Sequence, residues 1–261
     1  MKIFRALYSI YTILIFICLL VIGIPIFATA KIAKGKTREQ IVYFYLKFFG
    51  TFWCYLVGIV PINYNREKIK IQESVVMIAN HQSYFDPVEM YTAFNFLFKA
   101  LGKIEVSKTP LFGIIYSLAV VPIDRTSMRG RVKSFRLMQT FLKKNIPLLV
   151  YPEGTFPDVA QNELLPFQDG AFALAIESQK DIYPILFLDS AKRMRPNDFL
   201  GFTPGPLRTI FLPPISVQGL EKKDLAQVKE RCQNYMQSCL DRARRDGPEK
   251  VWKFASKELT L

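Results

Sequence analysis

The chain has 261 residues, of which 50% are hydrophobic, and a formal net charge of +13. It shows no aromatic RNA-binding strand, zinc knuckle or glycine-arginine tract, so we expect no nucleic-acid partner. A basic, hydrophobic chain instead indicates a protein that lies on an anionic membrane. The sequence has one histidine and no C-x-x-C pair, which argues against a metal site, and we expect no cofactor.

Residues 1–62 are predicted to form a hydrophobic membrane anchor of two helices. No charged residue occurs in residues 6–30, a run longer than the roughly 20 residues that cross a bilayer. A second apolar run, residues 41–62, is interrupted by Lys47 and follows a basic connector. Both ends of the first run are therefore basic. Either the first helix crosses the membrane and the second lies in the interface, or both enter one leaflet.

A second interpretation of the N-terminus is a cleaved signal peptide. Residues 28–30 read Ala-Thr-Ala, which resembles a signal-peptidase site. The apolar run is longer than the 7–15 residues, approximately, of a usual signal core, and another apolar run follows it. The anchor therefore remains the expectation, with the protein in a membrane and its active site on the cytoplasmic face.

Residues 63–261 are predicted to form one α/β domain, a mixed sheet flanked by helices. Short continuous apolar runs alternate with longer amphipathic segments, which is typical of a sheet covered on both faces. The expected strands are residues 75–79, 120–123, 148–151 and 182–187, with a late one near 209–212. The expected helices are residues 88–97, 111–119, 129–144, 170–178 and 222–245, the last being an amphipathic helix that covers the sheet.

Residues 80–86 read Asn-His-Gln-Ser-Tyr-Phe-Asp and follow the first expected strand of this domain. His81 is the one side chain that suits general-base catalysis near neutral pH. Asp86 is the nearest carboxylate that could hold the other ring nitrogen and stabilise the imidazolium. The alternative is a helix-capping asparagine beside a structural histidine.

Three more polar groups follow expected strands. Arg125, with basic residues at 129–136, suits a phosphate, although it could equally form a surface pair with Asp124. A carboxylate and a hydroxyl flank a flexible backbone at Glu153, Gly154 and Thr155, which suits a polyol head group or a plain turn. The fourth group contains Pro184.

These four groups resemble, in their order and spacing, the motifs of the glycerolipid acyltransferases, and most of all those of the 1-acylglycerol-3-phosphate acyltransferases. The four motifs read N-H-x-x-x-x-D, I-D-R, P-E-G-T and a hydrophobic-Pro-Ile step. The resemblance covers roughly residues 71–187. It implies that His81 is the general base and that Asp86 orients it. It also implies an acyl-CoA or acyl-carrier-protein donor, a lysolipid acceptor, no metal and a tunnel for the acyl chain. The residues implied in substrate binding are Asn80, Arg125, Glu153, Gly154, Thr155 and Pro184.

The chain departs from the family pattern at two positions. Phe156 stands where the third motif usually ends in Arg, and Gln168 stands where a Lys often precedes a Gly. Two cations that could hold an acceptor phosphate are therefore missing. The acceptor is expected to be 1-acylglycerol-3-phosphate bound by Arg125 and its basic neighbours, or else a different lysolipid.

Two other functions fit parts of the sequence. A lipid-binding protein that keeps the fold without catalysis would explain the missing cations, although the intact His, Asp and Glu set argues against it. A hydrolase could use His81 with water or with Ser83 as nucleophile, but the chain has no G-x-S-x-G motif.

Overall fold

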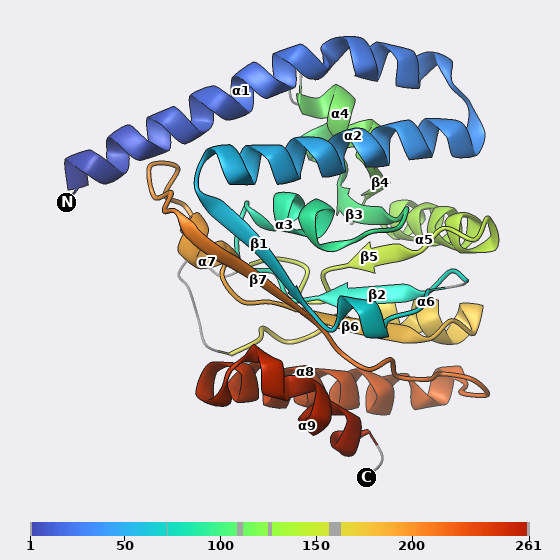
Figure 1. Ribbon diagram of the computed structural model, residues 1–261. Coiled ribbons are helices and arrows are strands. Elements are labelled where there is room, and N and C mark those ends of the chain that lie inside the picture. The colour runs from blue at the N-terminus through green and yellow to red at the C-terminus, as the bar shows by residue number, and fades with distance from the viewer. Residues whose placement is uncertain (1, 72, 109–111, 125–126, 157–162, 260–261) are drawn as a thin grey trace.

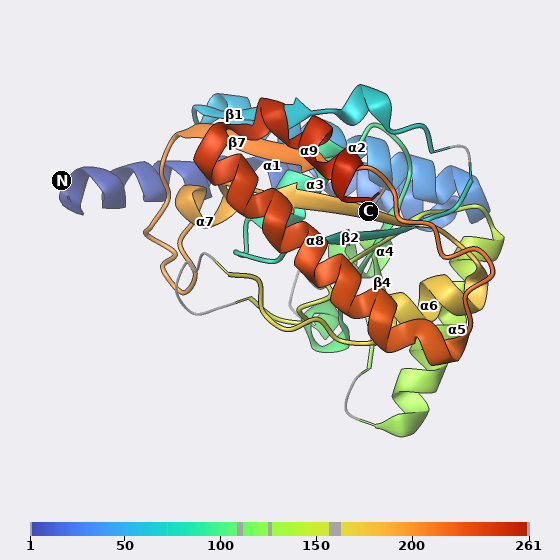
Figure 2. The same cartoon turned by 90° about the horizontal axis from the view of Figure 1, so that it is seen from below.

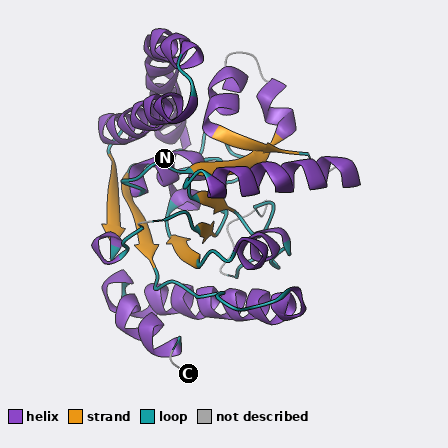
Figure 3. Ribbon diagram, turned by 90° about the vertical axis from the view of Figure 1, so that its right-hand side faces the viewer, coloured by secondary structure: helices purple, strands orange, loops and turns teal. Residues whose placement is uncertain are grey.

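The computed structural model describes residues 2–71, 73–108, 112–124, 127–156 and 163–259, and these form a seven-stranded mixed sheet with helices on both faces (Figures 1 and 3). The strand order is β1-β7-β6-β2-β5-β3-β4. All neighbours pair in parallel except β6 and β7. The predicted fold class is therefore confirmed. The strands are β1 (Ile59–Tyr64), β2 (Val76–Ala79), β3 (Lys99–Lys103), β4 (Val120–Ile123), β5 (Leu148–Val150), β6 (Ile182–Phe187) and β7 (Gly205–Phe211).

Two buried apolar layers lie on the two faces of this sheet. One face packs against α5, α6, α8 and α9, and the other against α2, α3 and α4, with α1 outside α2. In Figure 2, which views the molecule from below, α8 lies in front of the sheet and crosses it. The helices are α1 (Lys2–Ile32), α2 (Gly35–Leu56), α3 (Asp86–Ala93), α4 (Phe112–Ala119), α5 (Met128–Lys143), α6 (Gly170–Ser178), α7 (Ser190–Arg193), α8 (Leu225–Asp246) and α9 (Val251–Glu258).

The sequence predicts five of these strands and misses two. β1 lies at the end of the second apolar run, residues 41–62, which the sequence pattern assigns to the anchor. β3 reads Lys-Ala-Leu-Gly-Lys, which lacks the apolar pattern of a buried strand. Its Lys99 is nevertheless buried, because it forms an ion pair with Glu39 of α2. A paired charge of this kind lets a basic residue occupy an interior strand position.

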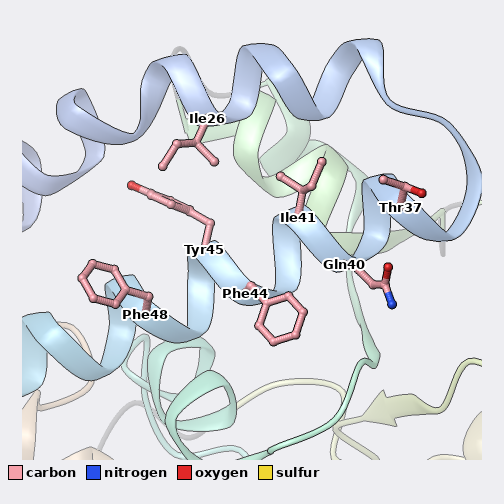
Figure 4. Close-up of a pocket in the computed structure, with 7 residues that line it drawn as sticks. All are labelled: Ile26, Thr37, Gln40, Ile41, Phe44, Tyr45 and Phe48. Atoms are coloured by element: carbon pink, nitrogen blue, oxygen red, sulfur yellow. The ribbon is translucent and has the colours of Figure 1, made fainter.

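The expected anchor of two apolar helices is corrected to one. In the described part of the chain, one helix, Ile3–Ile32, is long and apolar enough to cross a membrane. The second helix, α2, buries one face against α3, β1 and α4. Its opposite face exposes Phe44, Phe48 and Phe52. The α2 helix is therefore both a covering layer of the domain and an apolar surface beside α1. Figure 4 shows the groove between α1 and α2.

Candidate functional site

The polar residues that follow β2 and β5 meet at the carboxyl ends of these paired parallel strands. The chain leaves β2 at Ala79, turns through residues 80–85 and enters α3 at Asp86. The helix begins there because Pro87 fits the first helical turn, where no N–H partner is needed, and because an acid is favourable at a helix N-terminus. The turn and the helix start together hold His81 and Asp86 at this edge of the sheet.

Asn80 joins the turn to β6. The side chain is fully buried; its Nδ2 donates to the backbone oxygen of Phe187 at 2.9 Å, and its Oδ1 accepts from the Phe187 N–H at 2.7 Å. The carboxamide thus extends the β2–β6 pairing by one step beyond the end of β2. This contact fixes the residue that precedes His81, and the predicted substrate contact of Asn80 stays a prediction.

Replacing Asn80 by alanine is expected to destabilise the fold by about 2–5 kcal/mol, because the Phe187 N–H and C=O both lose their partner in a buried position. Urea unfolding measures this change. Thr155→Ala, at an exposed position after β5, is the control and should change stability by less than about 0.5 kcal/mol. Equal stabilities for the two variants would contradict a structural role for Asn80.

His81 and Asp86 form a close pair. The distance from His81 Nδ1 to Asp86 Oδ2 is 2.5 Å, and the Asp86 side chain is fully buried. The same Oδ2 accepts the N–H groups of Gln82 at 2.7 Å and Ser83 at 3.1 Å. Three donors on one oxygen favour the ionised carboxylate. A carboxylate held in this way fixes Nδ1 of His81 as the protonated ring nitrogen and leaves Nε2 to act as a base.

Aromatic rings surround His81. Tyr151 stacks on the imidazole with ring centroids 4.3 Å apart, and Phe156 meets it edge-on at 4.7 Å. The Phe156 ring also meets Tyr84, which in turn stacks on Phe199. The position expected to carry a phosphate-binding cation therefore holds a ring in direct contact with the His81 imidazole.

Ser83 is not placed as a nucleophile. Its side chain is fully buried, its Oγ donates to the Met194 backbone oxygen at 2.6 Å, and the same Oγ accepts the Phe85 N–H. The hydroxyl is thus committed to the scaffold. This geometry argues against Ser83 as the nucleophile of a hydrolase.

Most backbone N–H groups in residues 82–88 are also engaged. Asp86 Oδ2 holds those of Gln82 and Ser83, and backbone oxygens of the turn accept those of Asp86 and Val88. Within this segment, Tyr84 has the one N–H with no acceptor among the described residues. Among the described residues, this stretch therefore leaves one backbone N–H free to donate to a bound group.

Glu153 ties the histidine turn to the chain that precedes α6. Its Oε1 accepts the backbone N–H of His81 at 2.7 Å, and its Oε2 accepts that of Leu165 at 2.8 Å. Burial raises the pKa of Glu153 to about 7, and these two N–H groups oppose the rise. Gly154 adopts a φ of 74°, where a side chain would strain the backbone. This turn brings Glu153 beneath His81.

Arg125 lies outside the described residues, and its predicted phosphate contact stays a prediction. Pro184 lies within β6 opposite Ile78, back from the edge of the sheet where His81 and Glu153 meet. Its predicted place in a pocket wall stays a prediction.

One acid at the site escapes the sequence analysis. Glu89 lies one helical turn after Asp86 and is fully buried, with its Oε1 accepting from Thr209 Oγ1 at 2.8 Å. An acid in the first turn of a helix is usually exposed and favourable there. Nothing in the sequence around Glu89 distinguishes it from such a residue, because β7, which covers it, lies 120 positions further along the chain.

Comparison with known proteins places this geometry in a family. Residues 60–188 match the family model described as Acyltransferase. A Mycoplasma genitalium protein named "Probable 1-acyl-sn-glycerol-3-phosphate acyltransferase" is 29% identical over 150 residues, which cover 56% of this chain and 55% of that protein. The human protein named "1-acyl-sn-glycerol-3-phosphate acyltransferase alpha" is 29% identical over 174 residues, which cover 66% of this chain and 60% of that protein.

A solved structure shares the fold. The crystal structure of the 1-acyl-sn-glycerophosphate acyltransferase PlsC from Thermotoga maritima superposes with a TM-score of 0.73 at 17% identity, covering 94% of this chain and 96% of that one. The chain spans little more than half the length of the two curated relatives above. The match to the Acyltransferase family model takes in His81, Asp86 and Glu153, and the resemblance of the motifs to the glycerolipid acyltransferases is thereby confirmed.

Proposed function

We propose that the protein is a membrane-bound O-acyltransferase that moves a fatty acyl group from a thioester donor to the free hydroxyl of a lysolipid. The donor is acyl-CoA or acyl-carrier protein. The His81–Asp86 pair, joined at 2.5 Å with Nε2 of the imidazole unpartnered among the described residues, carries this proposal. The names of the relatives support the reaction class.

The reaction proceeds without an acyl-enzyme. His81 Nε2 takes the proton of the lysolipid hydroxyl as its oxygen forms a bond to the thioester carbonyl carbon, and the carbonyl electron pair moves onto oxygen. Asp86 stabilises the imidazolium that results. The tetrahedral intermediate then collapses, the C–S bond breaks, and the leaving sulfur receives the proton from His81. Neither a metal nor a cofactor takes part.

The oxyanion of this intermediate needs preorganised donors. The turn that carries His81 supplies few of them, because its N–H groups mostly bind Asp86 and the turn itself. The free N–H of Tyr84 is the candidate that this segment offers.

The membrane setting follows from α1. This helix has the length and composition to enter a bilayer, where both the lysolipid and its product reside. The junction of α1 and α2 carries Lys31 at the end of α1, Lys34 between the helices and Lys36 at the start of α2, and such basic segments favour the cytoplasmic side. We therefore place the active site at the cytoplasmic face.

We propose 1-acylglycerol-3-phosphate as the acceptor, which would give phosphatidate in phospholipid synthesis. Its phosphate would be bound by Arg125 and the exposed cations at the start of α5, Arg129 and Arg131 among them. One observation favours a different lysolipid: the ring of Phe156 contacts the base directly, where an acceptor head group would pass. A lysolipid with an uncharged or zwitterionic head group would need fewer cations there.

Thiol release by the purified protein in detergent tests the proposal. Palmitoyl-CoA and palmitoyl-carrier protein are supplied in turn, with lysophosphatidate or with uncharged and zwitterionic lysolipids. Acceptor-dependent release is the expected result, with lysophosphatidate as the preferred acceptor. Release with another lysolipid alone would reassign the acceptor. Free fatty acid formed without an acceptor, or no thiol release with any acceptor, would overturn the proposed function.

A further inference from the structure

Two carboxyl groups lie one turn apart at the start of α3 and are both withdrawn from solvent. Asp86 and Glu89 are each fully buried. Residues at this spacing share one face of a helix. Asp86 Oδ1 and Glu89 Oε2 are buried oxygens with no hydrogen-bond partner among the described residues. The other oxygen of each group is satisfied, by the turn for Asp86 and by Thr209 for Glu89.

Two buried carboxylates with one unpartnered oxygen each would repel one another and would both lack a donor. A single proton removes both problems, because a neutral carboxylic acid supplies one O–H donor. Asp86 is held ionised by three donors on Oδ2. The proton therefore belongs on Glu89.

Among the described residues, no cation acts on Glu89 to hold it ionised. The groups that act on it are Asp86 on its own helix, Thr209 on β7 and Asp189 after β6, whose charge is taken up by Arg208 at 2.7 Å. Cys54 of α2 and Tyr151 also lie within its electrostatic reach. Burial, and then the charge of Asp86, raise the pKa of Glu89 well above its ordinary value.

We propose that Glu89 stays protonated at neutral pH and that its O–H donates to Asp86 Oδ1, making Glu89 a positioning residue for the His81–Asp86 pair. This inference rests on the proposed function, in which His81 is the base. The hydrogen bond holds the Asp86 carboxylate in one orientation, with Oδ2 toward His81. It also takes up part of the negative charge of the Asp86 carboxylate that faces His81.

The pH dependence of kcat/KM tests this role. Glu89→Gln keeps a donor toward Asp86 and an acceptor toward Thr209. It should therefore leave the acid limb of the profile, the pH range in which kcat/KM falls as the pH is lowered, where it lies in the wild type. Glu89→Leu keeps the volume and removes the donor, and should lower kcat and move the acid limb upward by about half a unit or more. Thr92→Val removes a hydroxyl that donates to the Glu89 backbone oxygen at 2.8 Å. It loosens the same helix without touching the carboxyl, and its limb should stay in place.

Two outcomes of the pH profile would overturn the inference. An unmoved limb in Glu89→Leu would show that Glu89 only fills space. A limb that moves downward in Glu89→Gln would show that the wild-type carboxyl is ionised. Glu153, whose pKa burial raises to about 7, is retained in all of these variants.

Thermal unfolding gives a second measure that is independent of catalysis. A carboxyl whose pKa is raised by folding stabilises the protein fully below its unfolded pKa, and this contribution is lost as pH rises toward the folded pKa. The Tm of Glu89→Gln minus that of the wild type should therefore grow as pH rises from about 4.5 upward. A constant difference would contradict a buried proton. Full activity in His81→Ala would refute the proposed function, yet this unfolding test would still report on Glu89.

Discussion

Replacing His81 by alanine is expected to lower acyl transfer by about 10²–10⁴-fold, the usual contribution of a general base. The loss arises because no other imidazole exists in the chain. The fold should be retained, since the backbone N–H of residue 81 still donates to Glu153. Loss of the ring's hydrogen bond to Asp86 and of its stack on Tyr151 should cost about 1–3 kcal/mol of stability.

Lysolipid-dependent thiol release and thermal unfolding, measured on the same preparation, check this result. Ser83→Ala is the matched variant in the same turn. It removes the one hydroxyl of this turn that the hydrolase hypothesis names as a nucleophile, and the activity of each folded molecule should persist. Retained activity in His81→Ala, or lost activity in folded Ser83→Ala, would refute the proposed mechanism.

Asp86 gives the second large effect, and two substitutions separate its two roles. Asp86→Asn can place its one oxygen where Oδ2 stands and so keep the three hydrogen bonds from His81, Gln82 and Ser83. It removes the negative charge that stabilises the imidazolium, and it places an NH2 in the position of Oδ1, where the Glu89 carboxyl can accept from it. We expect activity to fall by about 10²–10⁴-fold, while the free energy of unfolding changes by less than about 1.5 kcal/mol.

Asp86→Ala removes the acceptor as well as the charge. Three donors then lose their partner at a buried position, and we expect a destabilisation of about 3–5 kcal/mol in addition to the loss of activity. Urea unfolding of both variants measures the difference. Equal stabilities would mean that the hydrogen bonds of Asp86 do not hold the turn, and full activity in the asparagine variant would mean that its charge does not act on His81.

The parts of the fold that follow from local patterns are predicted well from the sequence. α8 buries Val228, Cys232 and Met236 at the predicted helical spacing, and the apolar run before Asn80 forms β2. The errors occur where the structure of a segment depends on a residue that is far away in the sequence. Lys99 fits in a strand only because Glu39, 60 positions earlier in the numbering, neutralises it. The α2 helix looks like a membrane segment because both its faces are apolar, and only the sheet reveals which face is covered.

The same distinction holds at the site. The spacing of His81 and Asp86 across a turn and a helix start is local, so the sequence predicts their pairing, which the structure contains. The contacts of Asn80 with Phe187 and of Glu89 with Thr209 each span more than a hundred positions. No local pattern encodes them, and the sequence therefore assigns Asn80 to substrate and does not single out Glu89.

The attachment of α2 to the sheet has a consequence for producing this protein in soluble form. The C-terminal end of α3, the helix that begins with Asp86, is held from α2, because Tyr43 and Lys47 both donate to the Phe94 backbone oxygen. Cutting the chain at residue 62 would expose the apolar face beneath α2 and release this end of the catalytic helix. A water-soluble form is better sought by keeping α2 and changing its outward rings, Phe44, Phe48 and Phe52, to polar residues.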